Sequence, residues 1–124
     1  MRGRERHPGR DRDERLVENA RERGEQFLTG LRRIAAGHRS VGDVRGLGLM
    51  LALEFVDPAS GAAHTPDAAM TKRVQAEALA RNLIVLTAGT YANVVRIIPP
   101  LVTTAAEVDL ALGVLAESLT AAGA

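Results

Sequence analysis

The chain has 124 residues, a length that suits one domain with a core of its own. Hydrophobic residues make up 46% and charged residues 25%, as in an ordinary globular protein, but aromatic residues only 2%, so we expect a core of Leu, Val, Ile and Ala. The net charge of +1 gives no strong overall field, and the absence of cysteine excludes disulfides, thiolate metal sites and a cysteine nucleophile. This composition fits a cytoplasmic protein, and no apolar run approaches the ~20 residues of a membrane span.

Residues 1–13 combine Gly, Pro and mixed charges with almost no apolar side chain. Nothing in this segment can be buried to offset the entropy lost on ordering, so we predict that it is disordered and that residues 14–124 form the domain. The first 15 residues hold six Arg and four acidic residues. Because the acids are interleaved and no aromatic platform is present, we interpret the segment as a solvated tail and expect no nucleic-acid partner.

A helical pattern begins at Glu14. Apolar and small residues recur at three- and four-residue steps and therefore share one face: Val17, Ala20, Gly24, Phe27, Leu31 and Ile34. Gly37 is well placed to end this helix. Gly24 weakens a helix by up to ~1 kcal/mol relative to Ala, so its presence on the apolar face indicates a close contact with another element.

The next segment predicts a strand and then a helix. Val41–Val44 leads into Arg45-Gly46-Leu47-Gly48, and the Leu-rich run 49–56 is typical of a buried strand, with the glycines marking a bend or bulge at its start. Thr65-Pro66-Asp67 predicts a helix start with Thr65 as the cap. This helix is expected to end at Asn82 in a left-handed conformation, and its apolar stripe is Met70, Val74 and Ala78.

Two short strands are predicted at 83–86 and 93–98, joined by a loop at 87–91 around Gly89. Thr104 and Glu107 then have the spacing of a capping box and begin a final amphipathic helix. The order helix, strand, helix, strand, strand, helix predicts an α+β fold: a small three- to four-stranded sheet with helices mainly on one face.

Arg96 stands out because it lies in an apolar strand, Val94-Val95-Arg96-Ile97-Ile98. A guanidinium in such a place is costly unless it is paired or lies at an edge. One interpretation is a carboxylate clamp, because Arg offers planar, bidentate donors. The other is an Arg whose stem lies on the sheet while its head reaches water, and spacing alone favours this second interpretation.

The run Thr87–Leu101, TAGTYANVVRIIPPL, resembles the C-terminal signature of the class III pyridoxal-phosphate-dependent aminotransferases, of the 4-aminobutyrate aminotransferase type. Val44–Met50 resembles the Gly-rich strand start of that family, and Glu14–Ala20 the start of its small-domain helix. The resemblance covers roughly residues 14–122, and its specific part is the Arg-x-x-Pro-Pro-Leu run after a Gly-containing loop. It implies the C-terminal small domain of a fold-type I pyridoxal-phosphate enzyme.

The resemblance also implies a role for Arg96, because the matching arginine of the family binds the carboxylate of the amino-acid substrate. The resemblance therefore favours the carboxylate clamp over an Arg whose head only reaches water. It also implies that Gly89 and Thr90, in the loop beside Arg96, bind the substrate. Tyr91 belongs to the same loop, and for it a plain turn between two strands is at least as good an interpretation. The implied reaction moves an amino group from an ω-amine or amino acid to a 2-oxo acid.

The catalytic machinery of such an enzyme is not expected in this chain. The single lysine, Lys72, lies off the apolar stripe of its helix and matches no catalytic position of the family. The resemblance places pyridoxal phosphate on a large domain, so we predict no catalytic and no cofactor-binding residue here. We expect a fragment that is inactive alone, that begins at a displaced start, and that a large domain and a second subunit of a homodimer would complete.

Other kinds of site find little support. His7, His38 and His64 stand far apart and have no partner at metal-ligand spacing, so no metal site is predicted. The alternative to the aminotransferase fragment is a stand-alone interaction or oligomerisation module without catalysis. Apolar faces meant for absent neighbours would then stay exposed and favour self-association or a partner.

Overall fold

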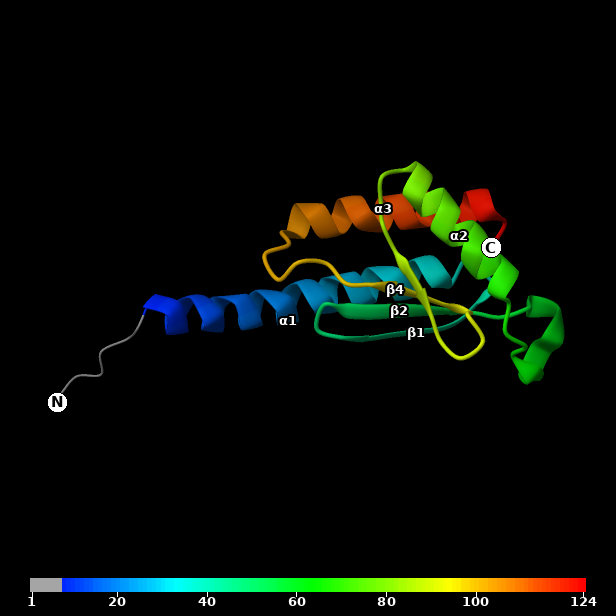
Figure 1. The fold of residues 1–124 in the computed structure, drawn as a ribbon, viewed down its shortest axis with the longest axis horizontal. Helices are drawn as coiled ribbons and strands as arrows, with labels where there is room; N and C mark the ends of the chain where they lie inside the picture. The colour runs from blue at the N-terminus through cyan, green and yellow to red at the C-terminus, as the bar shows by residue number, and fades with distance from the viewer. Residues whose placement is uncertain (1–7) are drawn as a thin grey trace.

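The computed structural model describes residues 8–124, which form four strands, three α-helices and one short 3-10 helix. The strands pair antiparallel in the order β1-β2-β4-β3, and all three α-helices lie on one side of the sheet (Figure 1). The predicted α+β class, the size of the sheet and the one-sided helices are confirmed. In chain order the elements are α1 Pro8–Ala35, β1 Val41–Leu47, β2 Met50–Phe55, η1 Pro58–Ala63, α2 Ala68–Ala80, β3 Leu86–Ala88, β4 Val94–Ile97 and α3 Ala105–Ala122.

The core lies between the sheet and the helices. Alternation along β2 buries Leu51, Leu53 and Phe55 on the helix-covered face, and α1 contributes Phe27 and Leu31 to the same cluster. The predicted stripe of α2 is buried as well (Met70, Val74 and Ala78), and so are Val108, Leu115 and Leu119 of α3, while Ala111 and Leu112 of α3 are partly buried. A fully buried Leu, Ile, Val, Met or Phe side chain stabilises the fold by about 1.5–3 kcal/mol relative to leaving it exposed, so aliphatic side chains supply most of the stabilisation of a core with few aromatics.

Helix α1 begins earlier than the sequence predicted. It starts at Pro8, so the predicted disorder of residues 8–13 is wrong, while the same prediction for residues 1–7 lies outside the described residues. Proline fits the first turn of a helix, and the Arg, Asp and Glu residues that follow prolong a helix already anchored by Phe27 and Leu31 at little further cost. The early turns extend beyond the sheet, which leaves Val17 exposed despite its place in the apolar pattern (Figure 1).

The run 41–56 forms a hairpin of two strands rather than one strand with a bend. Gly48, with a φ of 56°, follows β1 directly and allows the tight turn into β2 that a side chain would resist. The pattern hid β1 because most of its side chains are exposed. The strand predicted at 83–86 also begins later, at Leu86, because the carbonyl of Val85 accepts a hydrogen bond from Gln75 Nε2 at 3.1 Å instead of a ladder bond.

The predicted caps of α2 and α3 are confirmed except at the start of α2. Asp67, not Thr65, caps α2: its side chain accepts from the backbone N–H of Met70 at 2.9 Å, whereas Pro66 still forms a β-bridge with Val56 and keeps Thr65 outside the helix. The predicted left-handed Asn82 is confirmed, with a φ of 66°. The predicted capping box of Thr104 and Glu107 at the start of α3 is present in both directions.

Candidate functional site: the open face of the sheet

The face of the sheet that turns away from the helices carries the charged residues of the strands. In β4 the side chains of Val95 and Ile97 are buried on the helix side, so Arg96 between them points to the open face and is partly exposed. In the register of the sheet Arg96 is paired with Ala52 of β2 and with Leu86 of β3. The backbone of Arg96 is therefore held on both sides by neighbouring strands.

A second arginine lies in the same row of paired residues, here called the Arg96 row, which runs across the sheet through Arg45, Ala52, Arg96 and Leu86. Arg45 of β1 is paired with Ala52 from the other side, so Arg45 and Arg96 flank one small residue across three adjacent strands. Between them lies a shallow hollow of about 320 Å³, which Leu47 and Met50 also line. Ala52 contributes little volume, so the space between the two guanidinium groups stays open. An arginine with free donors at the rim of a partly apolar hollow suits a ligand that carries an anionic group.

The two arginines differ in their partners. Arg45 Nη1 donates to Asp43 Oδ2 at 2.7 Å and to Glu54 Oε2 at 2.8 Å. These hydrogen bonds, to Glu54 first and then to Asp43, raise the pKa of Arg45. The guanidinium of Arg96 has no hydrogen bond or ion pair with any residue in the described part of the chain, so its donors are available to an incoming carboxylate.

The loop between β3 and β4 holds the other predicted site residues. Gly89 has a φ of 92°, and its carbonyl accepts from the backbone N–H of Ala92 at 3.1 Å, which closes the turn. Thr90 and Tyr91 are exposed at its tip. Gly89 and Thr90 do not line the hollow at Arg96, so their role as substrate-binding residues stays a prediction.

Asn93 anchors this loop, although the sequence pattern indicates only that it begins a strand. Its side chain is buried, and Nδ2 donates to the backbone carbonyl of Phe55 at 3.0 Å. The backbone N–H of Phe55 donates in return to the carbonyl of Asn93 at 2.7 Å. Asn93 thereby fixes the end of the loop to the end of β2, three residues before Arg96. The signal available in the sequence was an amide residue directly before the mostly apolar strand Val94–Ile97, because a buried amide needs a hydrogen-bond partner.

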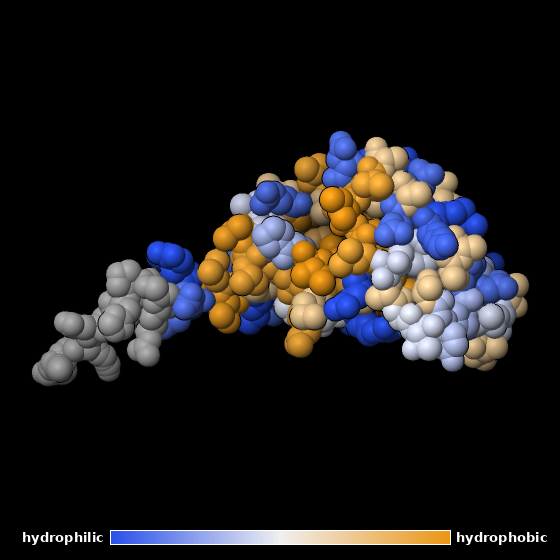
Figure 2. Space-filling view, in the orientation of Figure 1, coloured by the Kyte–Doolittle hydropathy of each residue, from blue (hydrophilic) through white to orange (hydrophobic). Residues whose placement is uncertain are grey.

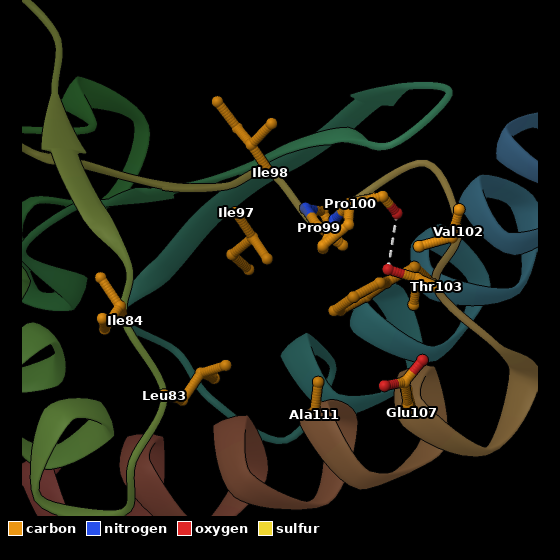
Figure 3. Close-up of a pocket in the computed structure, with 11 residues that line it drawn as sticks. Leu83, Ile84, Ile97, Ile98, Pro99, Pro100, Val102, Thr103, Glu107 and Ala111 are labelled. Carbon is orange, nitrogen blue, oxygen red and sulfur yellow. Dashed lines mark hydrogen bonds between the residues drawn. The ribbon is translucent and has the colours of Figure 1, made fainter.

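A second hollow of about 300 Å³ lies on the helix side of β4. The close-up shows Ile97, Leu83 and Ala111 around it, with Ile98 on the other side of the strand (Figure 3). Thr103 closes its rim by donating from Oγ1 to the carbonyl of Pro100 at 2.6 Å (Figure 3). The space-filling view shows apolar side chains gathered across the middle of this side of the molecule (Figure 2). The apolar lining offers packing surface and little chemistry.

Pyridoxal phosphate does not fit the residues of this chain. Schiff-base formation requires a lysine, and Lys72, the only one, is exposed on α2 and lies on none of the strands that carry Arg96 and the open face. The described residues contain no group of three or more His, Asp or Glu side chains that could hold a metal ion. Within residues 8–124, no helix has the length and apolar character needed to cross a membrane, and the cytoplasmic location stays a prediction.

Known proteins resemble this chain in sequence and in fold. A 5-aminovalerate aminotransferase from Pseudomonas aeruginosa is 39% identical over 105 residues, which cover 85% of this chain and 24% of that protein. A 4-aminobutyrate aminotransferase from Escherichia coli is 38% identical over 104 residues, covering 84% of this chain and 24% of that protein. A transaminase obtained by ancestral reconstruction has a solved structure that superposes with a TM-score of 0.78 at 34% identity, over 90% of this chain and 24% of that one.

The matched region is thus almost the whole of this chain, and the chain spans about a quarter of the length of the curated relatives it matches. The class III aminotransferase family implies pyridoxal phosphate as the cofactor. Most of the length of each relative lies outside the segment that corresponds to this chain. The sequence model of the family described as aminotransferase class III matches residues 11–119, which include α2, every strand, the Arg96 row and nearly all of α3. The chain belongs to the class III aminotransferase family.

Proposed function

We propose that this chain works as the C-terminal domain of a class III aminotransferase and that Arg96 binds the carboxylate of the substrate. The reaction would move an amino group from an ω-amine or amino acid to a 2-oxo acid. Two relatives are named for 5-aminovalerate and 4-aminobutyrate, amino acids that carry one carboxylate. A single well-held guanidinium is the group that such a substrate requires at its carboxylate end.

The observation that carries the proposal is the unpaired guanidinium of Arg96 on the open face. The strands on both sides fix its backbone, and the apolar side chains of Leu47 and Met50 line the same hollow. A guanidinium without a protein partner in partly apolar surroundings gains more from a bidentate carboxylate than one that is fully hydrated. These features support a binding role over that of an Arg whose head only reaches water.

The remaining parts of the reaction would come from outside these residues. When bound, pyridoxal phosphate supplies an electron sink for the amino-group exchange. We propose that a large domain holds this cofactor with its own lysine, and that a second subunit completes the site in a homodimer. On this proposal Lys72 takes no part, and the chain by itself does not transaminate.

The test is a chimera in which residues 14–124 replace the corresponding segment of the 5-aminovalerate aminotransferase. Arg96→Ala should raise the KM for the amino-acid substrate by roughly 10- to 100-fold, because a hydrogen-bonded charge contact contributes about 1.5–3 kcal/mol. Arg96→Lys should recover only part of the affinity, because an ammonium does not pair bidentately. The control is Arg39→Ala, an exposed arginine before β1, which should leave the KM unchanged. An unchanged KM in the Arg96→Ala chimera would remove the clamp.

A second candidate function, a stand-alone interaction module, is favoured by the exposed apolar side chains around the open face. Leu47 is 82% exposed, and other large apolar side chains near the sheet are more than half exposed, namely Met50, Leu86 and Ile98. Such a patch is typical of a surface that a partner covers. Either the large domain or another copy of the chain would serve, and the oligomeric state separates the two.

A further inference from the structure

Glu54 stands on the strand between those that carry the two arginines of the open face. It stands on β2, opposite Asp43 of β1 and Val94 of β4. Arg45 and Arg96 are both paired with Ala52, two residues earlier on the same strand and on the same face. Each arginine is therefore a diagonal neighbour of Glu54, and long side chains reach across that separation.

Of these two neighbours, Glu54 pairs with only one. Its Oε2 accepts from Arg45 Nη1 at 2.8 Å, and no contact with Arg96 is present among the described residues. Asp43 and Glu54 face each other directly, an arrangement in which like charges repel. Arg45 relieves this repulsion because it bonds both carboxylates at once.

We propose that Arg45 is a positioning residue that holds Glu54 and so keeps the Glu54 carboxylate away from the guanidinium of Arg96. Without Arg45, Glu54 would face the Asp43 carboxylate on one side and an unpaired cation on the other. Coulomb attraction would then draw Glu54 to Arg96. A substrate carboxylate would have to displace it, and this last consequence rests on the proposed function.

The first step can be tested on the 124-residue chain by NMR of the Arg96 side chain. Four proteins are compared: the wild type, Glu54→Gln, Arg45→Met, and the double variant. Glu54→Gln alone should barely move the Nε–Hε signal of Arg96. Arg45→Met should shift that signal clearly, and adding Glu54→Gln should return it towards the wild-type position.

Two outcomes would overturn the positioning role: an Arg96 signal that responds to Glu54→Gln equally with and without Arg45, or one that ignores Arg45→Met. The Arg45 side chain is 52% exposed, so its replacement opens no cavity in the core. Backbone amide spectra check the fold of each variant. If Arg45→Met does not fold, Arg45→Thr repeats the comparison with a residue that favours strands.

The second step is measured in the chimera. Arg45→Met should raise the KM for the amino-acid substrate by about fivefold, the scale of one exposed ion pair, and Glu54→Gln in the same chain should restore it. A general structural defect would not be repaired by a second substitution. If the NMR cycle behaves as expected but the KM does not move, the clamp at Arg96 fails while the positioning of Glu54 stands. If the NMR cycle fails, the positioning role falls whatever the kinetics show.

Discussion

The backbone of Gly48 lies directly against Gly24. A Cβ atom built on Gly24 would come within 2.2 Å of the Gly48 carbonyl oxygen and 2.5 Å of its carbonyl carbon. The contact joins the middle of α1 to the turn of the β1–β2 hairpin. Since the atoms in the way are backbone, they cannot move aside as the end of a side chain can. This contact sets how closely α1 approaches the strands that carry Arg45 and Glu54.

Gly24→Ala should therefore destabilise the chain by about 3 kcal/mol, measured as the free energy of unfolding in urea, because the helix and the hairpin must separate. The matched control is Gly113→Ala in α3, where an added Cβ meets nothing within 4 Å. This second variant should be about 0.5–1 kcal/mol more stable than the wild type, since Ala is the better helix former. Equal effects of the two substitutions would contradict the contact.

Asn93 should prove essential for the loop before Arg96. Asn93→Ala removes the bond to the Phe55 carbonyl and leaves a small cavity, so we expect a loss of about 2 kcal/mol in the free energy of unfolding. Asn93→Asp keeps the size of the side chain but would place a carboxylate oxygen against a carbonyl oxygen. It should destabilise the chain at least as much at neutral pH. A stable Asn93→Asp variant would show that packing alone, and not the hydrogen bond, holds the loop.

Local signals in the sequence were sufficient to predict the capping box of α3 and the apolar stripe of α2. The capping box of Thr104 and Glu107 involves residues three apart, and the stripe of Met70, Val74 and Ala78 needs only helical periodicity. The glycine at 24 indicated a close contact, but its partner at 48 lies across the fold and could not be named from spacing. Periodicity also placed Val17 on the buried face, because it does not reveal where the neighbouring sheet ends.

The candidate site was predicted in part. Arg96 was found because a charge inside an apolar strand is conspicuous, and its open position agrees with strand alternation. The network of Asp43, Arg45 and Glu54 was missed because β1 has a polar outer face and no apolar run to mark it as a strand. Which residues of β1 and β2 face each other depends on the hairpin turn, whereas the sequence pattern around Gly46 and Gly48 predicts only a bend or bulge.

The first half of α1, around Glu18 and Arg21, should lose helicity as the pH falls. Arg21 donates to the Glu18 carboxylate one turn earlier, and this hydrogen bond lowers the pKa of Glu18. A carboxyl with a depressed pKa contributes stability above its unfolded pKa and loses it as the pH drops through the folded value. The Cα chemical shifts of residues 14–22 should move towards coil values below about pH 4. In Glu18→Gln this part of the change should be absent. Identical titrations of the two proteins would contradict a role for the pair.

The open face should make the isolated chain self-associate. Leu47 and Met50 present exposed apolar surface beside the Arg96 row, and such surface gains free energy when a second copy covers it. Sedimentation velocity should show a concentration-dependent shift from monomer to larger species. Leu47→Lys combined with Met50→Lys should weaken this association at least tenfold, because burying two ammonium groups is costly.

The control for that experiment is Leu110→Lys on α3. Leu110 is 70% exposed, so it is comparably accessible, but it lies on a helix and not on the open face of the sheet. It should associate like the wild type. Loss of association in both variants would point to a general effect of added charge, and a wild-type chain that stays monomeric at high concentration would contradict the interaction module. In the chimera the same Leu47→Lys and Met50→Lys changes should impair assembly with the large domain if that domain covers the face.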